Sequence, residues 1–212
     1  MSGTWVTWNV RGLGRAEKRK SVRLALERVR PELVLLQETK LNDDREGSFR
    51  GWLNAGMEVV CVPAVHSPGG LATLWRRDIF NNERVIKGNG FLFVQLRIQS
   101  SGEVLFVGNV YGPQDVTGRV RMFEELGREV EGMEGRIVVG GDYNAILNDG
   151  ERQGVAVDTR GEGAFKDFVL SNFLIDLPMQ NGDFTWGSTR GSGLWSRLDR
   201  WLINEDALLG FD

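Results

Sequence analysis

The stretch TWVTWNV alternates apolar and polar residues with the two-residue period of a strand buried on one face. Val6, Trp8 and Val10 fall on one face, and Asn9 falls on the other together with Thr7. The glycines of the RGLG segment that follows break this pattern. We therefore expect a strand here, with Asn9 at the end of its polar face.

Three later stretches repeat apolar residues at the spacing of one helix face. The first covers residues 15–30 and is followed by Pro31, which favours a helix end. The apolar positions are Val22, Leu26 and Val29, then Phe123, Leu126 and Val130, and finally Phe165, Phe168, Val169 and Phe173. The basic residues of the first stretch lie opposite its apolar face, which is typical of a solvated helix rather than of a nucleic-acid contact.

Short runs rich in Val, Leu and Phe predict further buried strands. They lie at residues 32–38, 57–65, 71–75, 91–98, 103–111, 136–146 and 197–203. Several follow one another without a helical stretch between them, which favours hairpins over strict strand–helix alternation. The pattern therefore predicts a mixed or antiparallel layered α/β fold rather than a doubly wound parallel sheet.

The composition is that of a globular protein with one core. The 212 residues are 41% hydrophobic and 26% charged, and we take residues 1–212 as a single domain. No apolar run is long enough to cross a bilayer, no secretory signal is present, and a single cysteine excludes an intramolecular disulfide, so we expect an intracellular protein. A net charge of −3 disfavours a protein that holds nucleic acid by charge alone, but permits an enzyme that contacts it transiently.

Polar residues suited to chemistry stand at the ends of several predicted strands. Glu38 ends LVLLQE, where it is either a surface carboxylate or a ligand for a hard cation such as Mg²⁺. Asp142 and Asn144 follow a Gly-Gly pair and would point to one side of an extended backbone. Such a pair can activate water and hydrogen-bond a phosphate oxygen, although Gly, Asp and Asn also form plain turns. Asn9 and Tyr111 end two more strands, and each also suits an ordinary structural role, as a cap or a core residue.

The order of these motifs, rather than any one of them, points to a family. From Trp5 to Ile203 the segments WNVRGLG, LQETK, YGP, GGDYNAI, FTW and SRLDRWLI resemble the motif series of the endonuclease/exonuclease/phosphatase superfamily, which includes DNase I, exonuclease III and the AP endonucleases. They look most like the endonuclease domain of LINE-type retrotransposons, especially those of plants. AP endonucleases have an aspartate where this chain has Arg11, which argues against a repair role.

The resemblance implies a fold and a set of roles. The family fold is a four-layer α/β/β/α sandwich of two mixed β-sheets with helices outside, and its site lies at one end. By resemblance, Glu38 binds Mg²⁺ or Mn²⁺, and Asn9 helps to organise that metal site. Tyr111 and Asn144 would contact the scissile phosphate, and Asp142 would position or activate the attacking water. The reaction would be in-line hydrolysis of a phosphodiester of DNA.

The resemblance also implies partners and a rim that faces DNA. Thr185 matches a family position near this rim, Trp186 beside it either stacks on a base or sugar or simply packs, and Arg152 could reach the DNA backbone. The domain would be monomeric, would belong to a longer polyprotein with a reverse transcriptase, and would act in the nucleus.

Asp199, in SRLDRWLI, would by resemblance orient a catalytic histidine. Family members carry that histidine in a Ser-Asp-His element of a final strand, which this sequence lacks, and its one histidine, His66, falls in a predicted loop. We therefore expect a sandwich incomplete at its C-terminus, with its last strand or strands missing, an unpaired sheet edge and impaired activity. Three interpretations follow. The chain is an impaired metal-dependent endonuclease, an inactive retrotransposon-derived remnant that binds metal or nucleic acid without cutting, or a phosphatase of the same superfamily. The WNVRGLG and SRLDRWLI segments disfavour the phosphatase.

Overall fold

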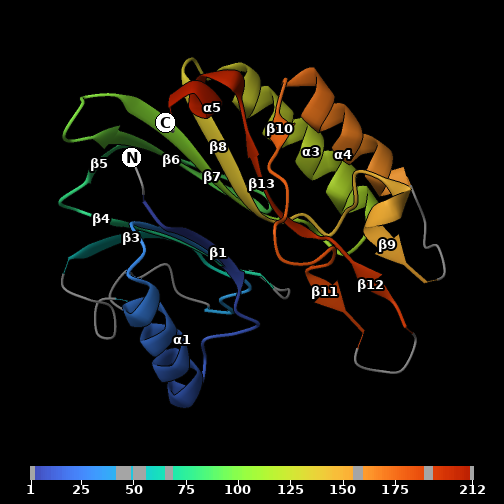
Figure 1. Cartoon of the computed structure of the whole chain (residues 1–212), viewed down its shortest axis with the longest axis horizontal. Coiled ribbons are helices and arrows are strands. Elements are labelled where there is room, and N and C mark those ends of the chain that lie inside the picture. The colour runs from blue at the N-terminus through green and yellow to red at the C-terminus, as the bar shows by residue number, and fades with distance from the viewer. Residues whose placement is uncertain are drawn as a thin grey trace.

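Two mixed β-sheets pack face to face in the computed structural model, and helices cover both outer faces (Figure 1). The structure describes residues 3–41, 49, 56–64, 69–154, 160–188 and 193–210. This arrangement confirms the layered α/β sandwich predicted from the sequence. In the described part of the chain, no helix has the length and apolar character needed to span a bilayer.

The four-stranded sheet has the order β1-β2-β4-β3. Its strands are β1 (Trp5–Asn9), β2 (Leu33–Gln37), β4 (Leu71–Arg76) and β3 (Met57–Val62), and α1 (Ala16–Val29) connects the parallel pair β1 and β2. Val6, Trp8 and Val10 pack on the α1 side with Val22 and Leu26, as the alternation predicted. Among the described strands, β1 has a partner on one side only, so it forms an edge of this sheet.

The six-stranded sheet has the order β10-β13-β8-β7-β6-β5. Its strands are β5 (Phe80–Gly88), β6 (Phe91–Ile98), β7 (Val104–Tyr111), β8 (Arg136–Asp142), β10 (Ile175–Asp176) and β13 (Asp199–Ile203). The strands β5, β6 and β7 form antiparallel hairpins, whereas β7 and β8 are parallel and joined through α3 (Val116–Glu131). The predicted hairpins in the middle of the chain are therefore present.

Helices α3 and α4 (Arg160–Ser171) cover the outer face of the six-stranded sheet. Their contact is aromatic, since the ring of Phe123 stacks on those of Phe165 and Phe168 with centroids 5.0 and 5.9 Å apart. The prediction that Phe173 belongs to this helix face is wrong. Phe173 lies beyond the end of α4 with a φ of 51°, and its side chain is 85% exposed.

The elements without a predicted counterpart include β5, β10, a small third sheet and two short helical elements. β5 exposes most of its side chains at a sheet edge, so it has no apolar run to detect. The third sheet has the order β11-β12-β9 and is built from two-residue strands, which are too short to show a period: β11 (Trp186–Gly187), β12 (Trp195–Ser196) and β9 (Arg152–Gln153). The two short helical elements are a 3₁₀ turn, η1 (Asp149–Glu151), and α5 (Glu205–Gly210).

The inner core lies between the two sheets and sets how they align. Leu33, Leu35 and Trp75 of the four-stranded sheet pack against Val107 and Val138 of the six-stranded sheet. The parallel strands β1 and β2 end at the same edge, and so do β7 and β8. Because β13 runs antiparallel to β8, its first residue joins that edge. One end of the sandwich therefore collects the polar strand ends that the sequence analysis singled out.

Candidate active site

Strand register brings the predicted site residues of each sheet together. In the six-stranded sheet, Tyr111 lies opposite Asp142 across β7 and β8, and Asp142 lies opposite Asp199 across β8 and β13. In the four-stranded sheet, Asn9 lies opposite Gln37, and Glu38 follows directly. The two groups meet at one end of the sandwich.

Asn9 joins the two sheets through its side-chain amide. Its Nδ2 donates to Glu38 Oε1 at 2.9 Å, on its own sheet, and to Asp142 Oδ2 at 3.0 Å, on the other. Its Oδ1 accepts a hydrogen bond from the backbone N–H of Arg11 at 3.1 Å. These three bonds orient the amide completely, because both donors and the acceptor are used.

Glu38 is held as a carboxylate by three donors. Tyr111 OH donates to Oε1 at 3.0 Å, alongside Asn9, and Lys40 Nζ lies 3.1 Å from Oε2. Burial alone would raise the pKa of Glu38, but the hydrogen bonds from Asn9, Lys40 and Tyr111 outweigh it and hold that pKa below its ordinary value. Glu38 adopts a left-handed φ of 50°, a conformation that non-glycine residues rarely adopt outside constrained sites. The side chain is therefore a charged carboxylate at neutral pH.

Asp142 and Asn144 form a local turn at the end of β8. The backbone N–H of Asn144 donates to Asp142 Oδ1 at 3.0 Å, and Asn144 Nδ2 donates to the carbonyl of Gly112 at 2.6 Å. Asp142 is only 6% exposed, and burial raises its pKa, opposed by the hydrogen bonds from Asn9 and Asn144. The charge of Glu38 raises this pKa further, whereas that of Arg11 lowers it. A carboxyl with a raised pKa is a better proton acceptor than an ordinary aspartate.

Asp199 begins β13 beside Asp142 and is held there by Thr185. The Oγ1 atom of Thr185 accepts hydrogen bonds from the backbone N–H groups of Leu198 and Asp199 at 2.9 and 3.0 Å. Burial and the charge of Asp142 raise the pKa of Asp199 to about 6, although the Thr185 hydroxyl and Arg11 oppose this. The histidine named in the sequence analysis, His66, lies outside the described residues.

The predicted DNA-facing residues lie on the small third sheet and differ in their surroundings. The guanidinium of Arg152 is engaged, with Nη1 2.7 Å from Glu162 Oε1 and Nε donating to Ser196 Oγ at 3.2 Å. Trp186 is partly buried. Trp195, which the sequence analysis did not name, is 48% exposed, and its ring crosses the face of Gly187, where an added Cβ would lie 2.4 Å from it. Trp195 is exposed and Ser196 beside it is buried, but β12 has two residues only and is too short for this alternation to be read from the sequence.

The residues at the site fit a hard divalent cation. Among the residues that the structure describes, no group of three or more His, Cys, Asp or Glu side chains could hold a metal. Mg²⁺ does not require such a group, because it keeps several waters and is often bound by one or two carboxylates. Glu38 supplies one oriented carboxylate, and the Lys40 ammonium that pairs with its Oε2 belongs to a partly exposed side chain, which would have to move aside for a cation to bind that oxygen.

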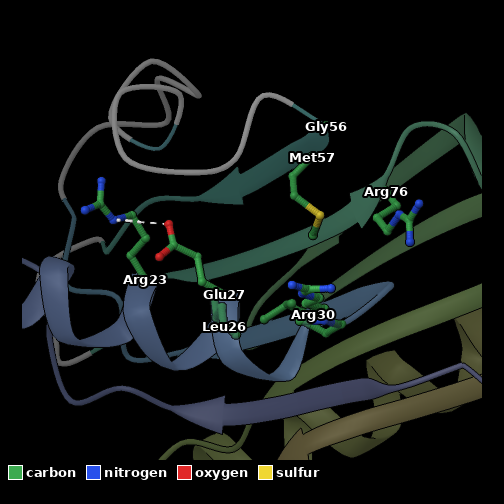
Figure 2. Close-up of a pocket in the computed structure, with 9 residues that line it drawn as sticks. Arg23, Leu26, Glu27, Arg30, Gly56, Met57 and Arg76 are labelled. Carbon is green, nitrogen blue, oxygen red and sulfur yellow. Dashed lines mark ion pairs between the residues drawn. The ribbon is translucent and has the colours of Figure 1, made fainter.

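A separate cavity of about 220 Å³ lies between α1 and the four-stranded sheet (Figure 2). Arg23, Arg30 and Arg76 line it above an apolar floor, and Arg23 pairs with Glu27 at 3.6 Å. Pro31 also lines it and precedes β2, whereas Glu38 follows β2. The cavity is therefore at the opposite end of that strand from the carboxylates and is no part of the candidate site.

Comparison with known proteins agrees with the fold. The sequence model of the Endonuclease/Exonuclease/phosphatase family matches residues 6–211. The "Transposon TX1 uncharacterized 149 kDa protein" of Xenopus laevis is 27% identical over 180 residues, which is 80% of this chain but only 13% of that protein.

Similar folds are found among solved structures. The AP endonuclease LMAP of Leishmania major superposes with a TM-score of 0.74 at 18% identity, over 95% of this chain and 79% of that one. The endonuclease domain of TRAS1, a telomere-specific non-LTR retrotransposon, superposes with a TM-score of 0.63 at 18% identity, over 96% and 86% of the two chains. At such identities the likeness shows a shared fold.

Proposed function

This chain belongs to the Endonuclease/Exonuclease/phosphatase family, and we propose that it is a metal-dependent phosphodiesterase domain that nicks DNA, of the type found in LINE retrotransposons and in particular those of plants. One observation carries the proposal: the Asn9 amide ties Glu38 of one sheet to Asp142 of the other, so that a candidate metal ligand and a candidate base face the same space. The similarity to part of a transposon protein and to a retrotransposon endonuclease fold supports a place in a larger retroelement protein.

In this proposal Glu38, oriented by Asn9, holds Mg²⁺ or Mn²⁺. A cation held there would supply stabilisation of the negative charge that develops in the reaction. Asp142 accepts a proton from the attacking water, for which its raised pKa suits it. The water oxygen forms its bond to phosphorus while the bond from phosphorus to the leaving sugar oxygen breaks, and that oxygen takes a proton from solvent.

Two further side chains position the phosphate. Burial and the charge of Glu38 raise the pKa of Tyr111, so its hydroxyl stays protonated. Its single hydrogen is donated to Glu38 here and would have to turn away from that carboxylate to reach a phosphate oxygen. Asn144 uses one of its two amide hydrogens on the Gly112 carbonyl, and the second is left for a phosphate oxygen. Thr185 acts through Asp199, whose backbone it holds, rather than on DNA directly.

A second candidate function is metal-dependent DNA binding without cutting. This candidate follows from the resemblance, in which Asp199 orients a histidine that turnover requires. The two candidates share the metal and the substrate and differ only in turnover.

Nicking of supercoiled plasmid with and without Mg²⁺ tests the proposal. Wild-type chain should nick in a Mg²⁺-dependent manner, and Glu38→Ala should lower the rate by about 10²-fold or more because the metal loses its carboxylate. Glu124→Ala is the matched control, since this glutamate is exposed on α3. Metal-independent nicking, or nicking unaffected by Glu38→Ala, would overturn the proposal, whereas Mg²⁺-dependent binding without nicking supports the second candidate.

A further inference from the structure

We infer that Arg11 binds the DNA phosphate at which the chain acts and supplies the second fixed positive charge of the site. This inference rests on the proposed function. Nothing in the motif series assigns a role to this arginine, and the AP endonucleases have an aspartate there.

The backbone of Arg11 is fixed by the two residues that organise the candidate metal site. Its N–H donates to Asn9 Oδ1 at 3.1 Å, and the N–H of the next residue, Gly12, donates to the carbonyl of Glu38 at 2.7 Å. Arg11 adopts a left-handed φ of 51°, which these two bonds on either side of it maintain. The side chain therefore leaves the backbone at a set position at the mouth of the site rather than from a free loop.

The guanidinium of Arg11 stands close to carboxylates without pairing with any of them. Arg11 is exposed and has no ion-pair partner among the side chains that the structure describes. Asn9, which accepts the Arg11 N–H, also donates to Asp142, so Arg11 extends from a backbone position beside these carboxylates, in agreement with the lowering effect of its charge on the pKa of Asp142 and of Asp199. A cation near two carboxylates, but not bonded to either, retains its hydrogen-bond donors for a ligand.

The charge balance of the site indicates what that ligand is. Glu38, Asp142 and Asp199 bring three negative charges to the space that a phosphodiester must enter. One divalent cation and Lys40 neutralise those three carboxylates, which leaves the negative charge of the phosphodiester itself without a partner. Arg11 supplies the positive charge that pairs with the phosphodiester. Its planar guanidinium can hydrogen-bond two phosphate oxygens at once, which a lysine ammonium does not do with the same geometry.

The shallow surface beside Arg11 leaves room for a nucleic-acid strand to extend past the candidate site. Arg11 and Lys40 line one shallow surface together with Arg15 and Lys18 of the α1 start, and Gly14 in this segment has no neighbour within 4 Å of an added Cβ. A strand whose phosphate contacts Arg11 would pass Lys40 on this open surface, where each contact with a phosphate releases a counterion.

The test compares wild type, Arg11→Gln, Arg11→Lys and the control Arg84→Gln, an exposed arginine on the edge strand β5. The probe is a duplex of about 20 base pairs with Mg²⁺ replaced by Ca²⁺, carrying one neutral methylphosphonate linkage at each position in turn; nicking is measured separately with Mg²⁺ on the unmodified duplex. Arg11→Gln should lower the affinity for the duplex and reduce the slope of log affinity against log salt by about 0.9. In wild type, one methylphosphonate position should weaken binding through loss of the Arg11 contact, and in Arg11→Gln this position should no longer have an effect. Arg11→Lys should keep the salt slope but lose most of the nicking rate, by about 10²-fold.

The outcomes separate this inference from the proposed function. If Arg11→Gln keeps both the salt slope and the methylphosphonate profile of wild type while Glu38→Ala abolishes nicking, the inference is wrong and the proposed function stands. If the wild-type chain neither binds nor nicks DNA with a divalent cation, both are wrong. An equal loss in Arg84→Gln would show a general charge effect and would also overturn the inference.

Discussion

Replacement of Asp199 by asparagine should stabilise the folded chain at pH 8. Burial and the charge of Asp142 across the β8–β13 pair raise the pKa of Asp199 from 3.8 to about 6. The folded chain therefore holds a proton on Asp199 more tightly than the unfolded chain does. It follows that the unfolding free energy decreases as pH rises between about 4 and about 6, and stays at the lower level above that range.

The size of the effect follows from the same shift. A pKa difference of this size corresponds to about 3 kcal/mol between the protonated and the ionised side chain. Asparagine is neutral at every pH, has nearly the same shape, and keeps an oxygen that can accept the Thr185 hydrogen bond. We expect Asp199→Asn to raise the unfolding free energy by about 2–3 kcal/mol at pH 8 and by less than about 1 kcal/mol at pH 4.5. In a chain of this length the change at pH 8 amounts to a rise in Tm of about 5–10 °C.

Urea unfolding followed by tryptophan fluorescence at the two pH values measures this difference. Asp183→Asn is the control, because Asp183 is exposed in the segment between β10 and β11. A destabilisation by Asp199→Asn at pH 8, or an equal change at both pH values, would refute the reasoning, because it would mean that a native interaction outweighs the penalty of burying the charge. If Asp199→Asn is more stable but nicks DNA more slowly, the buried charge lowers stability while it supports activity at the site.

Three further changes test other parts of the structure. Trp195→Ala should weaken binding of a fluorescent oligonucleotide about tenfold, since a stacked base contributes about 1–3 kcal/mol. The urea midpoint should stay unchanged because Trp195 is half exposed. Fluorescence anisotropy that shows unchanged binding would exclude this stacking surface. Gly141→Ala should lower the unfolding free energy by several kcal/mol, or prevent folding. The φ of Gly141 is 152°, and the new Cβ would lie 2.0 Å from the Val110 carbonyl oxygen of β7. A melting curve like that of wild type would contradict this backbone path. Arg200→Met should cost about 3 kcal/mol in urea unfolding, because the buried guanidinium lies 2.8 Å from both Glu151 and Asp176 and its loss leaves these two carboxylates with Arg197 as their one remaining ion-pair partner among the described side chains. A change under about 1 kcal/mol would argue against the network.

The elements that the sequence predicted are those with a continuous apolar signal. Every residue of β2 is buried, with Leu33 and Leu35 facing the other sheet and Val34 and Leu36 facing α1, so its run of apolar residues indicated a strand from the sequence alone. β5 has the opposite character. It is the longest strand described and exposes much of its surface at a sheet edge, where packing does not select apolar residues.

The site could be predicted as a set of residues but not as an arrangement. Each strand end was visible, because a polar residue directly after an apolar run marks the point at which a buried strand leaves the core. The contact between Asn9 and Asp142 was not, since 133 residues separate them and only the packing of the two sheets brings them together. Arg152 illustrates the same limit, because its pairing with Glu162 depends on how α4 lies against the small third sheet.

The way in which the two sheets are joined explains why the chemistry lies at this end of the sandwich. Toward the other end they meet through apolar side chains, which resist separation but do not select one alignment. Behind the site they meet through buried amides: Gln37 Nε2 donates to Thr7 Oγ1 at 3.0 Å within its own sheet and to Asn109 Oδ1 at 2.8 Å in the other. Asn109 Nδ2 in turn donates to the carbonyl of Ala72 at 3.1 Å, back in the first sheet. Because hydrogen bonds are directional, this network sets the position of one sheet relative to the other where a carboxylate from each must serve one phosphate.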